Sequence, residues 1–216
     1  IAGHARQSVT QQIVRVDRKS DDLPSVHLQQ QLADYIKCEI ANVDVVVCSD
    51  YGDGVLSQLV IDAALQHPHC IVDAQNGLDR YRGATLFTPN LPEAEQAVGY
   101  SINSPALVTQ AGKDLLELTQ AKQMLITRGE DGMSLFDRDG TEQHIPAFNR
   151  TDVFDVTGAG DTVVAALALS LCGGASFWEA AVLGNLAASI VIRQVGTATT
   201  NPDELKATLA AILDPA

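Results

Sequence analysis

The sequence predicts an α/β fold: a doubly wound, mostly parallel sheet with helices on both faces. Short apolar runs rich in β-branched residues alternate with longer stretches of helical periodicity, which is the pattern of strands joined by helical crossovers. The run Val43–Cys48 is almost wholly apolar, as expected of a strand covered on both faces of a parallel sheet. No internal repeat and no linker rich in Ser, Gly or Pro divides the chain, so we expect one domain over residues 1–216.

The elements follow one another in a regular order. Strands are expected over Ser8–Asp17, Val43–Cys48, Cys70–Val72, Gln123–Thr127, Met133–Phe136 and Gln143–Ile145. Helices are expected over Val26–Ala41, Leu56–Leu65, Ser104–Thr119, Asp161–Leu171, Ser176–Arg193 and a last one from Asn201. Ser104 before Pro105 is typical of a helix start, Ser176 and Glu179 form a capping box, and Asp139-Gly140 favours a hairpin turn. In such sheets ligands bind where strands end and helices begin.

Composition narrows the function classes. The chain has 14 Lys and Arg against 27 Asp and Glu, a formal net charge of -13, which disfavours nucleic acid and acidic membranes as partners. The longest apolar stretches, Val163–Leu171 and Leu186–Ile192, are far shorter than the roughly 20 residues of a membrane span. The four cysteines are widely spaced, and we expect buried thiols in a reducing cytoplasm. The chain opens at Ile1 directly in a strand-like stretch, so we expect a fragment whose N-terminal part is missing.

The segment Asp155–Thr162, just before an apolar helix, carries the most specific chemistry. Its glycines Gly158 and Gly160 let backbone N–H groups converge at a helix start, which is a binding site for an anion. Asp161 beside that site is placed as a base for phosphoryl transfer to an alcohol, although an N-capping Asp after a flexible turn is the alternative interpretation. Val163 breaks the dinucleotide-binding glycine pattern, and no P-loop motif occurs in the chain.

The run FDVTGAGDT at Phe154–Thr162 resembles the C-terminal signature of the ribokinase-like (PfkB) carbohydrate kinases. Other segments resemble the same family in the same order and cover nearly the whole chain. The resemblance implies a ribokinase-like fold, with residues 1–216 forming the C-terminal two-thirds of one kinase domain and residues 1–18 a lid or edge-strand region. It also implies ATP as co-substrate, Mg²⁺, a sugar or sugar-phosphate acceptor and a homodimer of the parent protein.

The resemblance also assigns roles to individual residues. Asp161 is then the catalytic base, and the anion hole consists of Gly158, Ala159 and Gly160. The nucleotide-binding positions are Thr127, Gly129, Gly132 and Asn185. Asn90 and Glu93 help to hold Mg²⁺ through water, and a monovalent cation such as K⁺ is assigned to Asp155, Thr157, Gly196 and Thr200. The substrate positions are Asp50, Arg80 and Arg82.

When the family is set aside, a purely structural interpretation stays open for five of these residues. Asn90 and Glu93 also suit a helix cap and a helix surface, and Asn185 suits a polar residue bonded within a helix bundle. Arg80 and Arg82 either clamp a substrate phosphate or are solvated. The cluster at His67–Cys70 lacks further metal ligands and is interpreted as a loop.

Within the family, the sequence is most similar to the heptose 7-phosphate kinases of ADP-heptose synthesis. Ser49–Tyr51, the run Arg80–Thr85, Thr127-Arg128 and, in the lid region, Gln12, Arg15 and Asp17 carry this likeness. Two positions depart from the subgroup, which has Lys where Asp53 stands and Asp-Pro-Lys where Asp73-Ala-Gln75 stands.

The expected function is therefore phosphorylation of heptose 7-phosphate at O1. The alternatives are another sugar or nucleoside kinase and a catalytically silent nucleotide-binding fragment, and we expect the 216 residues alone to be inactive.

Overall fold

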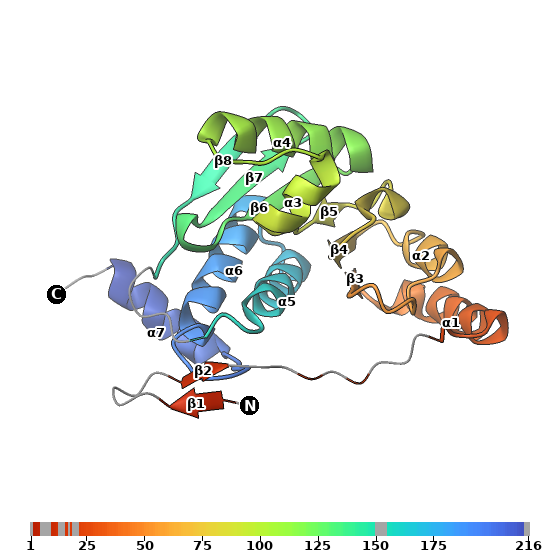
Figure 1. Ribbon diagram of the computed structural model, residues 1–216, viewed down its shortest axis with the longest axis horizontal. Coiled ribbons are helices and arrows are strands. Elements are labelled where there is room, and N and C mark those ends of the chain that lie inside the picture. Colours follow the sequence, from red (N-terminus) through yellow and green to blue (C-terminus); the bar gives the residue numbers. More distant parts are fainter. Residues whose placement is uncertain are drawn as a thin grey trace.

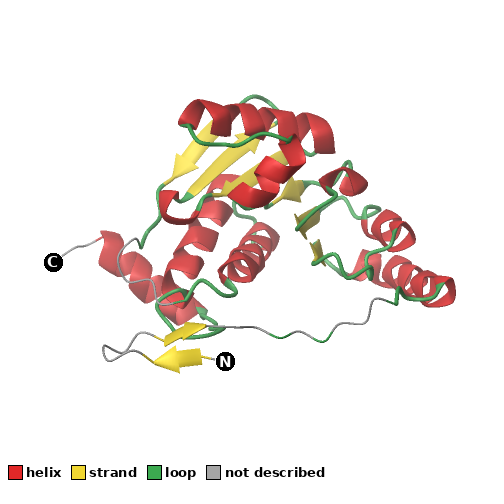
Figure 2. Ribbon diagram, viewed as in Figure 1, coloured by secondary structure: helices red, strands yellow, loops and turns green. Residues whose placement is uncertain are grey.

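The computed structural model describes residues 2–4, 10–12, 16, 18, 22–149 and 155–213. Its main sheet has six strands in the order β3-β4-β5-β6-β7-β8 (Figure 1; Figure 2). These strands span Val46–Asp50, Cys70–Ala74, Leu86–Phe87, Gln123–Thr127, Met133–Asp137 and Glu142–Ile145. β3 to β6 run parallel, whereas β7 and β8 form an antiparallel hairpin. The predicted α/β, mostly parallel architecture is confirmed.

Seven α-helices surround this sheet in the described part of the chain: α1 (Val26–Glu39), α2 (Gln58–Ala64), α3 (Leu91–Val98), α4 (Pro105–Thr119), α5 (Ala159–Cys172), α6 (Phe177–Val191) and α7 (Pro202–Leu213). Short 3₁₀ turns lie at Ile40–Asn42, Leu78–Tyr81 and Gly129–Asp131. Ser104 and Ser176 cap α4 and α6 as predicted, the latter with Glu179 in a capping box.

Two hydrophobic clusters show that both faces of the sheet are covered. One cluster joins the strands to α2, α3 and α4, and the other joins them to α5 and α6. Successive side chains of β6 point to opposite faces of the sheet. Met124 and Ile126 therefore belong to the first cluster and Leu125 to the second. Figure 1 shows α3 and α4 above the sheet and α5 and α6 below it. This sandwich leaves the carboxyl ends of β3 to β6 open for a site.

Two expectations need correction at this level. The strand predicted at Val43–Cys48 is β3, which among the described strands lies at the edge of the sheet and pairs with β4 alone, so Val47 is 41% exposed rather than covered on both faces. Cys48 and Cys70 are buried, but Cys38 and Cys172 are exposed because they lie on outward positions near the ends of α1 and α5.

The N-terminal region is described only in part. β1 (Ala2–His4) and β2 (Thr10–Gln12) form a separate two-stranded antiparallel sheet. The strand predicted over Ser8–Asp17 therefore coincides with β2 at three residues, and Arg15 and Asp17 lie outside the described residues. Throughout the part of the chain that is described, every helix is too short or too polar to cross a bilayer.

Candidate active site

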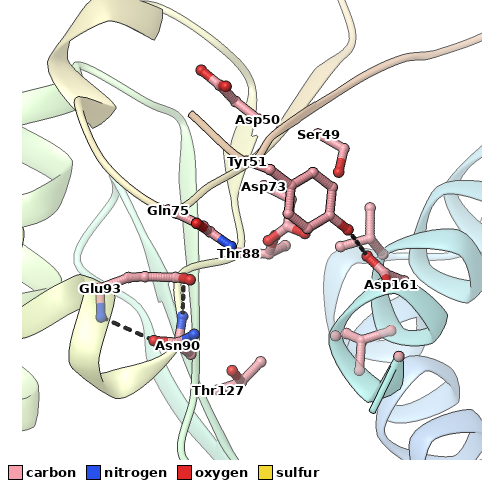
Figure 3. Close-up of a pocket in the computed structure, with 14 residues that line it drawn as sticks. Ser49, Asp50, Tyr51, Asp73, Gln75, Thr88, Asn90, Glu93, Thr127 and Asp161 are labelled. Carbon is pink, nitrogen blue, oxygen red and sulfur yellow. Dashed lines mark hydrogen bonds between the residues drawn. The ribbon is translucent and has the colours of Figure 1, made fainter. Parts of the chain in front are cut away.

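A cavity of about 160 Å³ opens where the parallel strands end and α5 begins (Figure 3). Its polar lining comes from segments far apart in the sequence: Ser49, Asp50, Tyr51, Asp73, Gln75, Thr88, Asn90, Glu93, Thr127 and Asp161. The order of the strands places these segments side by side, because each lies at or just beyond the carboxyl end of its strand. The sheet therefore collects oxygen-rich side chains at one edge, opposite the first turn of α5.

The first turn of α5 combines an acid with open backbone donors. Gly158 is the N-cap and has no side chain to cap the helix, and Ala159 donates its N–H to the Val156 carbonyl at 3.1 Å. The N–H groups of Gly160 and Asp161 have no partner within the helix, since they lie in its first turn. Of the residues predicted to form an anion hole, Ala159 therefore uses its amide locally, whereas the Gly160 amide has no partner within the helix.

Asp161 itself is exposed and points into the cavity. Its Oδ1 accepts a hydrogen bond from the Tyr51 hydroxyl at 2.7 Å (Figure 3). Asp161 thus lies beside the helix N-terminus and faces the carboxylates on the sheet.

Asp73, at the carboxyl end of β4, is a site residue to which the sequence reasoning assigned no role. Burial is the main cause that raises the pKa of Asp73 to about 6; a hydrogen bond from Thr88 opposes this shift, and the nearby charges of Glu93 and Asp161 add to it. Burial also raises the pKa of Glu93. These carboxyl groups therefore share one small volume and repel one another, which favours a bound cation.

Asn90 and Glu93 form the helix cap that the sequence allowed, and they also face the cavity. They form the capping box of α3, in which each side chain accepts the other residue's backbone N–H at 2.9 Å. The same two side chains line the cavity (Figure 3). No three acidic, His or Cys side chains among the described residues are close enough to hold a metal directly. The donor set thus fits Mg²⁺ that keeps most of its waters and is anchored by few carboxylates.

A second, larger and more apolar cavity of about 520 Å³ adjoins the first. It contains all four predicted nucleotide-binding residues: Thr127, Gly129, Gly132 and Asn185. Asn185 is buried and donates its amide to the Pro146 carbonyl at 2.8 Å, so it also ties α6 to the segment after β8. Thr127, Gly160 and Val163 line both cavities. A molecule in one cavity would therefore meet a molecule in the other at the first turn of α5.

The predicted residues for a monovalent cation are only partly brought together. Asp155 accepts N–H groups from Thr157 at 2.9 Å and from Gly196 at 3.1 Å. The Thr157 side chain, followed by these two N–H groups, holds the pKa of Asp155 below its usual value. Thr200, in contrast, donates its hydroxyl to Glu204 at 2.9 Å and serves the start of α7. Asp155 therefore joins two loops next to the N-terminus of α5.

The predicted substrate residues are not assembled as expected. Asp50 lies in the cavity wall, but its oxygens accept from the Gly52 N–H at 2.9 Å, the Tyr81 hydroxyl at 2.6 Å and Arg80 at 3.3 Å. Arg80 also donates to the Leu56 carbonyl and does not line the cavity. Arg82 points elsewhere, to the Leu118 carbonyl of α4 at 3.2 Å. Oxygens of the protein therefore bind both guanidinium groups in this structure.

The fold has two adjoining cavities at the carboxyl ends of its parallel strands, and a sequence comparison identifies the family. The chain belongs to the pfkB family of carbohydrate kinases, whose pattern matches residues 8–204.

Its relatives include the bifunctional protein HldE of Geobacter metallireducens, 42% identical over 204 residues that make up 92% of this chain and 41% of the relative. The corresponding protein of Desulfatibacillum aliphaticivorans is 43% identical over 206 residues, or 92% of this chain and 42% of the relative. The chain thus spans about two fifths of the length of these relatives.

Solved structures show the same fold. The phosphofructokinase-2 of Escherichia coli in complex with potassium superposes with a TM-score of 0.75 and 22% identity, covering 89% of this chain and 64% of that one. The ribokinase of Arabidopsis thaliana complexed with ribose and ATP gives a TM-score of 0.70 and 20% identity, covering 87% and 60%. The predicted ribokinase-like fold is therefore confirmed.

Proposed function

We infer that the protein transfers the γ-phosphoryl group of ATP to a hydroxyl of a sugar phosphate, namely the anomeric hydroxyl of a heptose 7-phosphate. The observation that carries this proposal is the position of Asp161 and the Gly160 amide at the boundary of two adjoining cavities. Family membership supports a carbohydrate acceptor. The motif likeness to heptose 7-phosphate kinases and the identity with HldE proteins support the particular sugar.

We propose the following roles, which the lining of the two cavities supports. The larger cavity, lined by Phe148, Met133 and Ile192, suits the flat adenine base, and its boundary with the first cavity suits the transferred phosphoryl group. The N–H groups of Gly160 and Asp161 stabilise negative charge on that group, while the Asp161 carboxylate accepts the proton of the attacking hydroxyl. Bound Mg²⁺, anchored through water by Asn90 and Glu93, would neutralise phosphate charge.

Other proposals rest on the family resemblance. A K⁺ ion beside Asp155 would reinforce the N-terminus of α5, where Asp155 already joins the Thr157 and Gly196 loops. We also propose a cytoplasmic homodimer for the natural full-length protein. The lid function of residues 1–18 belongs with these proposals.

Gln75 supports a second candidate acceptor. It lines the first cavity at the position where the heptose 7-phosphate kinase subgroup has Lys, and it brings no charge toward a sugar phosphate. Asp53, the other departure, does not line this cavity. The alternative function is therefore a kinase of the same family for a different sugar or a nucleoside.

The test uses the natural full-length protein with Mg²⁺, ATP and a panel of heptose 7-phosphate, fructose 6-phosphate, ribose and adenosine. We expect transfer to heptose 7-phosphate, and Asp161→Asn should lower kcat by about 10²-fold or more while nucleotide binding persists. Asp114→Asn, on α4 outside both cavities, is the matched control. If Asp161→Asn leaves the rate unchanged, the assignment of Asp161 as the catalytic base is refuted. Nucleotide binding without transfer to any acceptor indicates the catalytically silent nucleotide-binding fragment.

A further inference from the structure

Tyr51 makes a contact that the proposed reaction does not explain. It follows β3 directly, and its hydroxyl donates to Asp161 Oδ1 at 2.7 Å across 110 residues of sequence. Figure 3 shows the ring crossing the cavity from the sheet side to α5. Tyr51 thus links the two walls at the reactive carboxylate.

The geometry of this contact matches the one that an acceptor must make. A general base has to lie within about 2.6–3.2 Å of the oxygen whose proton it takes, and the Tyr51 oxygen occupies that range. The hydrogen bond to Asp161 also raises the pKa of Tyr51, so its hydroxyl stays protonated and remains a donor at neutral pH. An alcohol of the acceptor and the tyrosine hydroxyl therefore compete for the same carboxylate oxygen.

The following inference rests on the proposed kinase function. We propose that the Tyr51 hydroxyl is a surrogate for the acceptor hydroxyl, in that it forms the hydrogen bond to Asp161 that the acceptor would form. It occupies Asp161 while the acceptor site is empty, and the incoming sugar displaces it. In this way it limits transfer of the phosphoryl group to water. In that side reaction the bond between the γ-phosphorus and the β–γ bridging oxygen breaks, a bond to the water oxygen forms, and Asp161 accepts the water proton.

The surroundings of Tyr51 suit a side chain that is held in place but can be displaced. The Asp50 carboxylate fixes the base of the loop through the Gly52 N–H, and is itself held by Tyr81 and Arg80. Gly52 and Gly54, which follow Tyr51 in the loop, have φ values of +74° and +79°. Glycine adopts this backbone conformation readily. Tyr51 is 51% exposed, so its ring can leave Asp161 without opening the core.

The experiment compares Tyr51→Phe with Tyr100→Phe in the natural full-length protein. Tyr100 is the matched control, because its hydroxyl donates to Asp114 at the same 2.7 Å and it lines neither cavity. Two readouts are measured with Mg-ATP: ADP release without acceptor, and kcat and KM for heptose 7-phosphate. Tyr51→Phe should raise acceptor-independent hydrolysis and lower the acceptor KM, each by about tenfold, the factor expected for one hydrogen bond to a charged group. Tyr100→Phe should change neither.

The outcomes separate this inference from the kinase proposal. If Asp161→Asn abolishes transfer but Tyr51→Phe leaves hydrolysis and KM unchanged, the surrogate role is wrong and the kinase proposal stands. A fall in kcat alone for Tyr51→Phe also overturns it, because that result assigns Tyr51 to orienting Asp161. If the wild-type protein phosphorylates no acceptor and Asp161→Asn does not change the rate of ATP hydrolysis, the kinase proposal itself fails.

Discussion

Replacing Asp73 with Asn should stabilise the protein at neutral pH. Burial raises the pKa of the Asp73 carboxyl from 3.8 to about 6, so the folded protein binds this proton more tightly than the unfolded chain does. Ionisation of Asp73 therefore destabilises the folded protein. The free energy of unfolding falls as the pH rises from about 4 to about 6 and does not recover at higher pH. Each pKa unit corresponds to about 1.4 kcal/mol, so the cost at pH 7.5 is about 3 kcal/mol at most.

Urea unfolding at pH 5 and pH 7.5 measures this effect. The gain in free energy of unfolding for Asp73→Asn should be about 1.4 kcal/mol larger at pH 7.5 than at pH 5, since Asp73 is largely protonated at the lower pH. Saturating Mg²⁺ should narrow the gap by stabilising the wild-type protein. Asp139→Asn is the control, and it should change the free energy of unfolding in the opposite direction, because the Thr141 N–H lowers the pKa of Asp139. Parallel stability profiles for Asp73→Asn and the wild type would refute the argument.

Two further substitutions test the structure at other points. Gly132→Ala should lower the free energy of unfolding by about 2 kcal/mol or more, because the added Cβ would lie 2.0 Å from the Ile145 carbonyl oxygen. Gly140→Ala should lower the free energy of unfolding less, because Gly140 also has a positive φ but has open space around it. Equal urea midpoints for the two variants would contradict this packing. Gln75→Lys should lower the KM for a phosphorylated acceptor about fivefold and leave that for an unphosphorylated sugar unchanged, since one added cation is worth about 1 kcal/mol near a phosphate. Asp53→Lys, outside the cavity lining, is its control; an equal effect of the two lysines would show that Gln75 does not face the acceptor.

Local sequence signals predicted most of the fold. The caps at Ser104 and Ser176 act within one helical turn, and the glycine-rich turn before Asp161 is equally local, so both could be identified from neighbouring residues. β5 has only two residues, too few for any periodicity, and it was not delimited. Whether a strand lies at the edge of a sheet depends on its partners, which is why the exposure of Val47 was not foreseen.

The same distinction between local and distant contacts holds for the candidate site. Several segments that line the cavities match a family motif and lie either at the end of a strand or at the start of α5, so local sequence predicts them. The family resemblance predicts Arg80 and Arg82 as substrate residues, but carbonyl groups 24 and 36 residues away bind them in the structure. The bond between Tyr51 and Asp161 spans 110 residues and has no local signal at all.

The capping box of α3 ties the proposed chemistry to the integrity of the domain. The Glu93 carboxylate that faces the cavity is also the group that satisfies the Asn90 N–H at the start of the helix. A lineage that gave up the reaction would therefore still be selected to keep Asn90 and Glu93, since losing either frays α3. Retention of this pair alone is accordingly a poor marker of an active homologue, whereas Asp161, which caps nothing, is a sensitive one.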